Sequence, residues 1–218
     1  MNSLNKNGRI SGLFYLLVAV FASFAMIVRS NIIGSDPALA IENEMLFRLA
    51  ILSDLLGQVF HVLLIISLFY LFKHINKYCA VLMSILALIP VPIAMLNQLN
   101  QYASLLIVSN TDPLNAFSTD QLQSLAMLFQ NLFNKGVLIA QIFWGLWLFP
   151  LGFLTYKTGN VPKVIAILLF ISGSGYLVDS IGKLLFPNYI LTIASFTFIG
   201  ELVFTFWLLI KGIKGKNL

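Results

Sequence analysis

The sequence predicts an all-α integral membrane protein, with about six transmembrane helices, both termini in the cytoplasm and a small helical cap on the outer side. The chain has 218 residues, of which 59% are hydrophobic and only 10% are charged. Its mean hydropathy is +0.93. Soluble domains carry roughly a quarter charged residues, so most of this surface must face lipid. The six spans use up the chain, which predicts one domain over residues 1–218 and leaves no room for a soluble catalytic or nucleic-acid-binding domain.

Six apolar runs, each long enough to cross about 30 Å of hydrocarbon, support this prediction. They cover residues 10–28, 46–72, 78–108, 136–156, 161–184 and 190–210. The first run follows Lys6 and Arg9 and resembles a signal peptide. With about 19 apolar residues it exceeds the usual apolar core of a signal. We therefore expect it to remain as the first helix.

The distribution of charge predicts the orientation. The N-terminus, the second and fourth connections and the C-terminus hold nine of the thirteen basic residues and no acidic one: Lys6, Arg9, Lys73, Lys77, Lys157, Lys163, Lys211, Lys214 and Lys216. Arg29, Arg48, Lys135 and Lys183 lie toward the other side, with Asp36, Glu42, Glu44, Asp112 and Asp120. The excess of basic residues places both termini in the cytoplasm.

Three local signals refine the helices. Pro90 and Pro92 remove backbone donors and should kink or break the third span. Ser118 and Gln121 form a capping box, and a helix from there through Tyr156 would be about 57 Å long, more than the bilayer needs. Its first part should therefore lie on or above the outer surface. Asp36 followed by Pro37 predicts a second short outer helix.

Charged groups inside a membrane are costly, so each is a candidate functional residue. Asp54 and Asp179 fall about 9 Å to the outer side of the midplane and Glu201 falls near it. Asp54, Gln58 and His61 share one helix face, and Asp179 is spaced to pair with Lys183. With the amides of the third and fourth spans, they predict an outward-facing polar cavity. The candidate binding residues are Arg48, Asp54, Gln58, His61, Asn97, Gln101, Gln141, Asp179, Lys183 and Glu201.

Three interpretations of these residues stay open. The first is a structural ion-pair network that joins helices. The second is a small-molecule or lipid-binding, transport-type or accessory membrane protein, in which Asp54 and Glu201 contact the ligand and Arg48 is their counter-charge or an anion contact. The third is an intramembrane lipid-modifying enzyme with Glu201 or Asp54 as base and His61 assisting. HExxH, GxSxG and phosphate-binding glycine motifs are absent from the sequence. One imidazole with carboxylates is a poor zinc site.

We therefore expect no catalytic or metal-binding residues and no cofactor. The expected partners are the lipid bilayer and a small-molecule or lipid ligand, and no nucleic acid is expected. The single cysteine, Cys79, excludes an intrachain disulfide.

Several segments resemble a family of bacterial multi-pass membrane proteins, domain of unknown function 4386. They are Arg9–Gly12, Phe47–Leu49 leading into Asp54–Leu56, Phe143–Gly152, Lys157–Pro162, Gly175–Asp179 and Gly200–Gly212. The matching residues include Arg48, Asp54, Asp179 and Glu201, whereas His61 and the Pro90/Pro92 pair lie outside the pattern. The resemblance implies a multi-pass protein of the bacterial inner (plasma) membrane and implies no activity.

Overall fold

The structure, a computed structural model, describes residues 3–32, 42–109 and 117–213. Within these ranges the regular elements are helices, and they include no strand. Six stretches are long and apolar enough to cross a membrane: Lys6–Asn31, Glu44–Phe72, Lys77–Val108, Thr119–Lys157, Lys163–Leu185 and Ala194–Lys211. The predicted class, an all-α bundle of six membrane helices, is confirmed.

Three of the six stretches are interrupted helices. The first, second and fifth are α1 (Ser3–Ile32), α3 (Glu44–Phe72) and α8 (Lys163–Leu185). The third is α4 (Lys77–Leu88) followed by α5 (Pro90–Val108), the fourth is α6 (Thr119–Leu146) followed by α7 (Leu148–Lys157), and the sixth is α9 (Ala194–Thr197) followed by α10 (Ile199–Lys211).

Proline accounts for two of the interruptions. The third stretch breaks at Ile89, immediately before Pro90, as predicted. The fourth breaks at Trp147, because Pro150 has no N–H to donate to the carbonyl of Leu146. The backbone bonds from Trp147 to Phe143 (3.1 Å) and from Leu151 to Trp147 (3.2 Å) continue the helix across this point.

The predicted capping box begins α6. The Ser118 N–H donates to Gln121 Oε1 at 2.9 Å, and the Gln121 N–H donates to Ser118 Oγ at 3.4 Å. From there the helical stretch runs for 39 residues to Lys157, or about 58 Å at 1.5 Å per residue. It is therefore longer than a bilayer core, as expected. The predicted short helix at Asp36 and Pro37 lies outside the described residues.

The sixth span begins later than predicted. Helix starts at Ala194 rather than at residue 190, because the preceding residues form a loop whose last backbone amides bind a side chain of α8. A tightened turn at Phe198 then separates α9 from α10, and the N–H of Glu201 donates to the Phe198 carbonyl at 3.0 Å.

The chain forms two compact units, and each is described by itself. Unit 1 comprises Met1–Leu17, Phe60–Val91 and Leu138–Leu218, and unit 2 comprises Val18–Val59 and Pro92–Val137. The prediction of one domain stays a prediction. In unit 2, apolar clusters join α1 to α3, α3 to α5, and the end of α5 to the start of α6.

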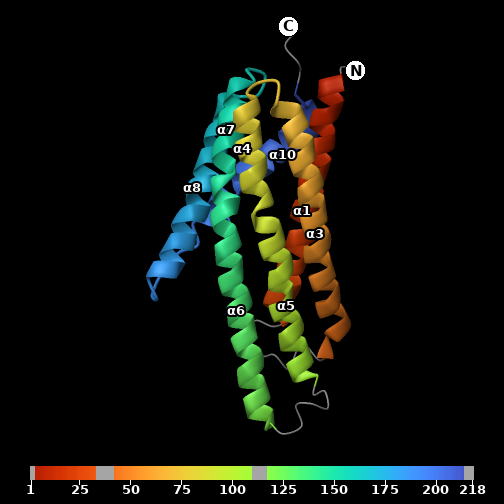
Figure 1. Ribbon diagram of the computed structural model, residues 1–218, viewed down its shortest axis with the longest axis vertical. Coiled ribbons are helices and arrows are strands. Elements are labelled where there is room, and N and C mark those ends of the chain that lie inside the picture. Colours follow the sequence, from red (N-terminus) through yellow and green to blue (C-terminus); the bar gives the residue numbers. More distant parts are fainter. Residues whose placement is uncertain (1–2, 33–41, 110–116, 214–218) are drawn as a thin grey trace. The chain divides into compact units, whose positions relative to one another are not determined.

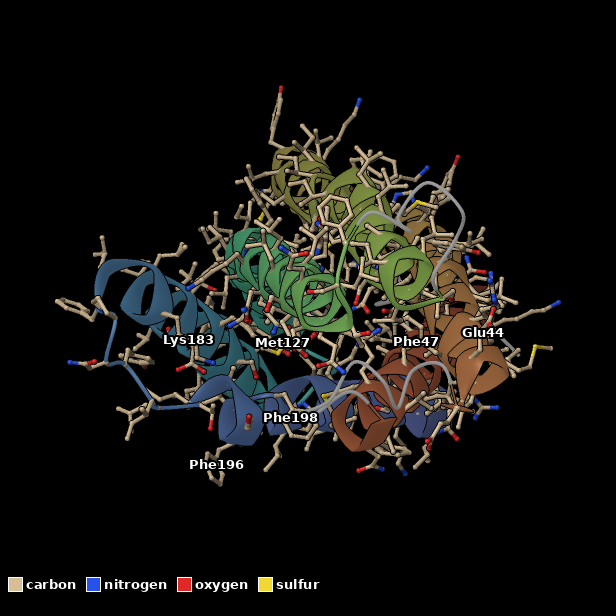
Figure 2. All side chains as sticks on the ribbon, turned by 90° about the horizontal axis from the view of Figure 1, so that it is seen from below. Glu44, Phe47, Met127, Lys183, Phe196 and Phe198 are labelled. Carbon is tan, nitrogen blue, oxygen red and sulfur yellow. The ribbon has the colours of Figure 1, made fainter. Side chains whose placement is uncertain are left out.

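Small residues set the packing of unit 1, where α7 lies against α4 and α8, and α10 lies against α8 (Figure 1). A Cβ atom on Gly145 or on Gly173 would lie 2.8 Å from the other residue's carbonyl oxygen. A Cβ on Gly12 would lie 2.7 Å from the backbone nitrogen of Leu209, so α1 and α10 also touch backbone to backbone. Glycine permits this close approach of membrane helices.

Gly200 gives a direct test of this packing. A Cβ there would lie 2.5 Å from the Leu168 carbonyl oxygen, so Gly200→Ala should cost about 1–3 kcal/mol of stability through overpacking. Gly57→Ala is the matched control, because its Cβ would have 3.5 Å to its nearest neighbour and alanine favours helix by about 1 kcal/mol. Thermal unfolding in detergent should show a lower midpoint for Gly200→Ala only. Equal effects of the two substitutions would contradict the packing described.

Candidate functional site

Three acidic side chains lie away from the ends of the membrane-spanning stretches: Asp54 on α3, Asp179 on α8 and Glu201 on α10. The sequence predicted all three as intramembrane charges. Because an unpaired charge is costly in a low-dielectric medium, the partners of each acid indicate what it does. These partners differ in kind.

Asp54 is neutralised by an ion pair within unit 2. The guanidinium group of Arg29, on α1, pairs with the Asp54 carboxylate, and the two side chains are only 19% and 13% exposed. Gln98, on α5, donates from Nε2 to the same carboxylate at 3.1 Å. The Arg29 guanidinium carbon lies 5.0 Å from the centroid of the Phe133 ring on α6. Four helices therefore meet at one ion pair, which we call the Asp54 network.

Amide side chains extend this network between α5 and α6. Asn97 donates to the carbonyl oxygen of Phe133 at 2.8 Å. Gln130 donates to Gln101 Oε1 and to Ser104 Oγ, each at 3.2 Å. A Cβ on Gly136 would overlap the Asn97 amide, so glycine makes room for it. Buried amides bonded in this way join membrane helices.

Arg48 does not have the predicted role of counter-charge. Its guanidinium group binds Glu44, one turn earlier on α3, with Nε–Oε1 2.7 Å and both side chains 41% exposed. The i, i+4 spacing on one helix favours this local pair. The counter-charge of Asp54 is therefore Arg29, which corrects the prediction of Arg48.

Asp179 is occupied by hydrogen bonds to the loop that leads into α9. It is 1% exposed. Its Oδ1 accepts from the Tyr189 hydroxyl (2.9 Å) and the Ile193 N–H (3.0 Å), and its Oδ2 accepts from the Ala194 N–H (2.7 Å). Partial burial and the bond to Asp179 raise the pKa of the Tyr189 phenol. Among the described residues no ion pair joins Asp179 to Lys183, so that predicted pair is wrong. The carboxylate instead binds the start of α9.

Glu201 has hydroxyl groups as partners instead of a cation. The Tyr15 hydroxyl of α1 donates to its carboxyl group, and the Tyr176 side chain of α8 interacts with the same group. In the described part of the chain, both salt bridges belong to other acids. Tyr15 is buried, whereas Glu201 and Tyr176 are partly exposed. We call these three residues the Glu201 centre.

An aromatic cluster in unit 1 includes Tyr15 of this centre. The ring centroid of Trp147 is 5.9 Å from that of Tyr15 and 5.7 Å from that of His61. Both Trp147 and His61 are almost fully buried, and His61 Nε2 has no hydrogen-bond partner among the described residues. His61 is therefore a buried ring in an aromatic cluster with one ring nitrogen unpaired.

Short contacts of α8 with α9 and α10 position the Glu201 carboxyl group. Gly200 lies against the backbone of α8, and the Ser172 hydroxyl donates to the carbonyl of Thr197. One turn further along α8, Gln141 of α6 donates to the Tyr176 carbonyl oxygen at 3.2 Å. Because Gly200 precedes Glu201 directly, its close approach brings the acid to the level of Tyr176.

The predicted site residues fall into separate groups. Unit 2 holds Arg48, Asp54, Gln58, Asn97 and Gln101, and unit 1 holds His61, Gln141, Asp179, Lys183 and Glu201. A single outward-facing cavity formed by all of them stays a prediction. No group of three or more His, Cys, Asp or Glu side chains that could hold a metal ion occurs in residues 3–32, 42–109 and 117–213.

The sequence analysis missed the two tyrosines of the Glu201 centre. Tyr15 and Tyr176 interrupt apolar runs, where a tyrosine resembles a packing residue. The sequence did contain one signal: both tyrosines lie at about the same membrane depth as Glu201, the lone acid near the midplane. A buried tyrosine hydroxyl usually finds a hydrogen-bond partner, so these hydroxyl groups could have been assigned to the acid.

Residues 10–212 match the family described as Domain of unknown function (DUF4386). The chain belongs to this family. An uncharacterized protein of Archaeoglobus fulgidus is 47% identical over 76 residues, which are 35% of this chain and 46% of that protein. The chain thus spans about half the length of this relative. No solved structure matches. The resemblance seen in the sequence is confirmed, and it assigns no activity, because the function of the family is unknown and the relative is uncharacterized.

The Asp54 network predicts strong coupling between Arg29 and Asp54 in the DUF4386 protein. Breaking a mostly buried pair leaves one charge uncompensated, so Asp54→Asn and Arg29→Gln should each cost about 3 kcal/mol. The double variant should cost much less than their sum. Arg48→Gln, which breaks the exposed pair, should cost about 0–1 kcal/mol. Denaturant unfolding in detergent measures all four, and additive effects of Asp54→Asn and Arg29→Gln would contradict the network.

Proposed function

We propose that this DUF4386 protein is a membrane-embedded binding protein of the transport type, whose Glu201 centre binds the amine group of a small amphipathic molecule. One observation carries the proposal. Of the three intramembrane acids, only Glu201 has neither a cation nor a backbone amide bound to its side chain. A carboxyl group in this setting is stabilised when a cation binds it.

Electrostatic and hydrogen-bonding chemistry supports an amine as the ligand group. A carboxylate oxygen accepts a charge-assisted hydrogen bond from an ammonium group, and such bonds are about twice as strong as neutral ones. The Tyr15 hydroxyl donates to one oxygen of the carboxyl group and holds the acid in place, and Glu201 as a residue is partly exposed, as access for a ligand requires. The aromatic ring of Tyr176, whose side chain interacts with the same carboxyl group, would add attraction for a cation that lies over its face.

The surroundings of Glu201 favour a ligand that arrives from the lipid phase. Apolar side chains around Glu201 reach the protein surface: Phe198, three residues earlier and on the same side of the helix, is 39% exposed, and Leu202 is partly exposed. In a membrane-spanning helix these side chains face hydrocarbon. An amphipathic molecule can therefore place its alkyl part against them while its amine group reaches the carboxyl group.

The excess of basic residues at one set of helix ends supports the proposed orientation of the protein in its membrane. We place the protein in the plasma membrane with both termini on the cytoplasmic side. Arg9, on α1, donates to the carbonyl oxygen of Ile210 near the end of α10 at 3.1 Å. The first turns of α1 and the last turn of α10 therefore lie at the same end of unit 1, as this topology requires.

Binding of dodecylamine to the purified protein tests the proposal, with dodecanol as the neutral probe of the same length. Removing a charged hydrogen-bond partner costs about 1.5–3 kcal/mol, so Glu201→Gln should weaken dodecylamine binding by about tenfold or more. Dodecanol binding should change little. Native mass spectrometry of the same samples identifies any molecule that co-purifies with the wild type and is absent from the variant.

Glu44→Gln serves as the matched control, because it removes an exposed acid that already binds Arg48. It should leave dodecylamine binding unchanged. If a folded Glu201→Gln protein binds dodecylamine as tightly as the wild type, the Glu201 centre is not an amine site and its role is structural.

A further inference from the structure

A crevice in unit 1 lies between the start of α1 and the end of α3. Its volume is about 170 Å³, and Asn7, Ile10, Ser67 and Tyr70 line it. Ser67 and Tyr70 are three residues apart and therefore share a face of α3. Gly8 and Gly12 pack on residues 208–213, so the crevice uses a different face of α1. Tyr70 is 53% exposed, and the crevice is open to the surroundings of the protein.

The crevice lies where two membrane-spanning stretches end. Asn7 is the second residue of the stretch Lys6–Asn31, and Tyr70 is two residues before the end of the stretch Glu44–Phe72. Tyrosine is enriched at this level, where lipid headgroups meet the hydrocarbon region. A ligand in the crevice would therefore have its polar part beside Asn7 and Tyr70 and its apolar part along Ile10.

The charge at the rim of the crevice is positive. Lys73 lies one turn beyond Tyr70, with its ammonium nitrogen 4.4 Å from the centroid of the Tyr70 ring. Lys6 precedes Asn7. The helix ends on this side carry basic residues and no acidic one, and the salt bridges in the described ranges do not include Lys73. A phosphate group would supply the missing counter-charge.

We propose that the crevice binds an anionic phospholipid, with its phosphodiester group between Asn7 and Lys73 and an acyl chain along Ile10. The side chains match this chemistry. The Asn7 amide and the Tyr70 hydroxyl are hydrogen-bond donors for phosphate oxygens, and the Lys73 ammonium group adds charge. Basic pockets between helices on the cytoplasmic side of membranes bind such headgroups. This site is separate from the Glu201 centre and does not depend on its function.

Lipid binding to the full-length protein tests the proposal, with phosphatidylglycerol as the anionic probe and phosphatidylcholine as its zwitterionic counterpart. Native mass spectrometry counts bound lipids on folded protein only. Lys73→Ala should raise the apparent Kd for phosphatidylglycerol about fivefold, the effect of one basic residue near an anionic headgroup. Lys73→Arg should restore binding. Ser67→Leu, which fills the crevice and keeps the charge, should also weaken binding.

Lys163→Ala is the control. Lys163 also lies over a tyrosine ring, 5.1 Å from the centroid of Tyr156, but outside the crevice. It should leave phosphatidylglycerol binding unchanged, so a loss confined to Lys73→Ala and Ser67→Leu supports the site. Equal binding of the two lipids to the wild type, or equal losses in Lys163→Ala and Lys73→Ala, would overturn it.

Discussion

The free-energy cost of a carboxylate in a low-dielectric medium constrains each acid within the membrane-spanning helices. Asp54 meets this constraint with a cation, Arg29, that comes from another helix. Asp179 meets it with a tyrosine hydroxyl and two backbone amides, which fix the start of α9. Glu201 has only hydroxyl partners at its side chain. The first two arrangements hold helices and a loop in place, whereas the third leaves a carboxyl group with neither a cation nor a backbone amide, which is why we propose it as the ligand-binding acid. This difference separates structural acids from the acid that we assign to function.

Close helix packing makes the Glu201 centre possible. Glycines bring α10 against α8 and α1 against α10, so the carboxyl group lies near hydroxyl groups from two other helices. In a bilayer, where helices gain little from the hydrophobic effect, such contacts provide much of the association energy. Larger residues at Gly12 or Gly200 would separate the backbones and move Tyr15 or Tyr176 away from the acid. In α10 the residue that permits close helix packing, Gly200, therefore directly precedes the proposed ligand-binding acid, Glu201.

The sequence predicted the six spans, the break at Pro90, the capping box at Ser118 and the three intramembrane acids, because these depend on local composition and on burial cost. It did not predict the partners. The sequence placed Arg29, Arg48 and Asp54 toward the outer side of the membrane. Choosing between the two arginines requires knowing which face each helix turns toward its neighbours. Helices that are apolar on most faces give no sequence pattern that fixes this orientation. Arg48 forms its ion pair with Glu44, one turn away on the same helix. Asp179 accepts hydrogen bonds from the loop after α8 and does not pair with Lys183. Tyr15 and Tyr176 were missed for the same reason, because their hydroxyl groups gain meaning only once Glu201 is placed beside them.

Thermal unfolding of Asp54→Asn, Asp179→Asn and Glu201→Gln, measured side by side in one detergent, tests the assignment of these acids most directly. Each substitution keeps the shape of the side chain and removes its charge. Loss of a charge that a cation or backbone amides offset destabilises a protein, whereas loss of a charge that has neither removes a desolvation cost as well as its hydroxyl bonds. The account predicts lower midpoints for Asp54→Asn and Asp179→Asn, and an unchanged or higher midpoint for Glu201→Gln. A fall for Glu201→Gln as large as for the other two would contradict it and make Glu201 a third structural acid.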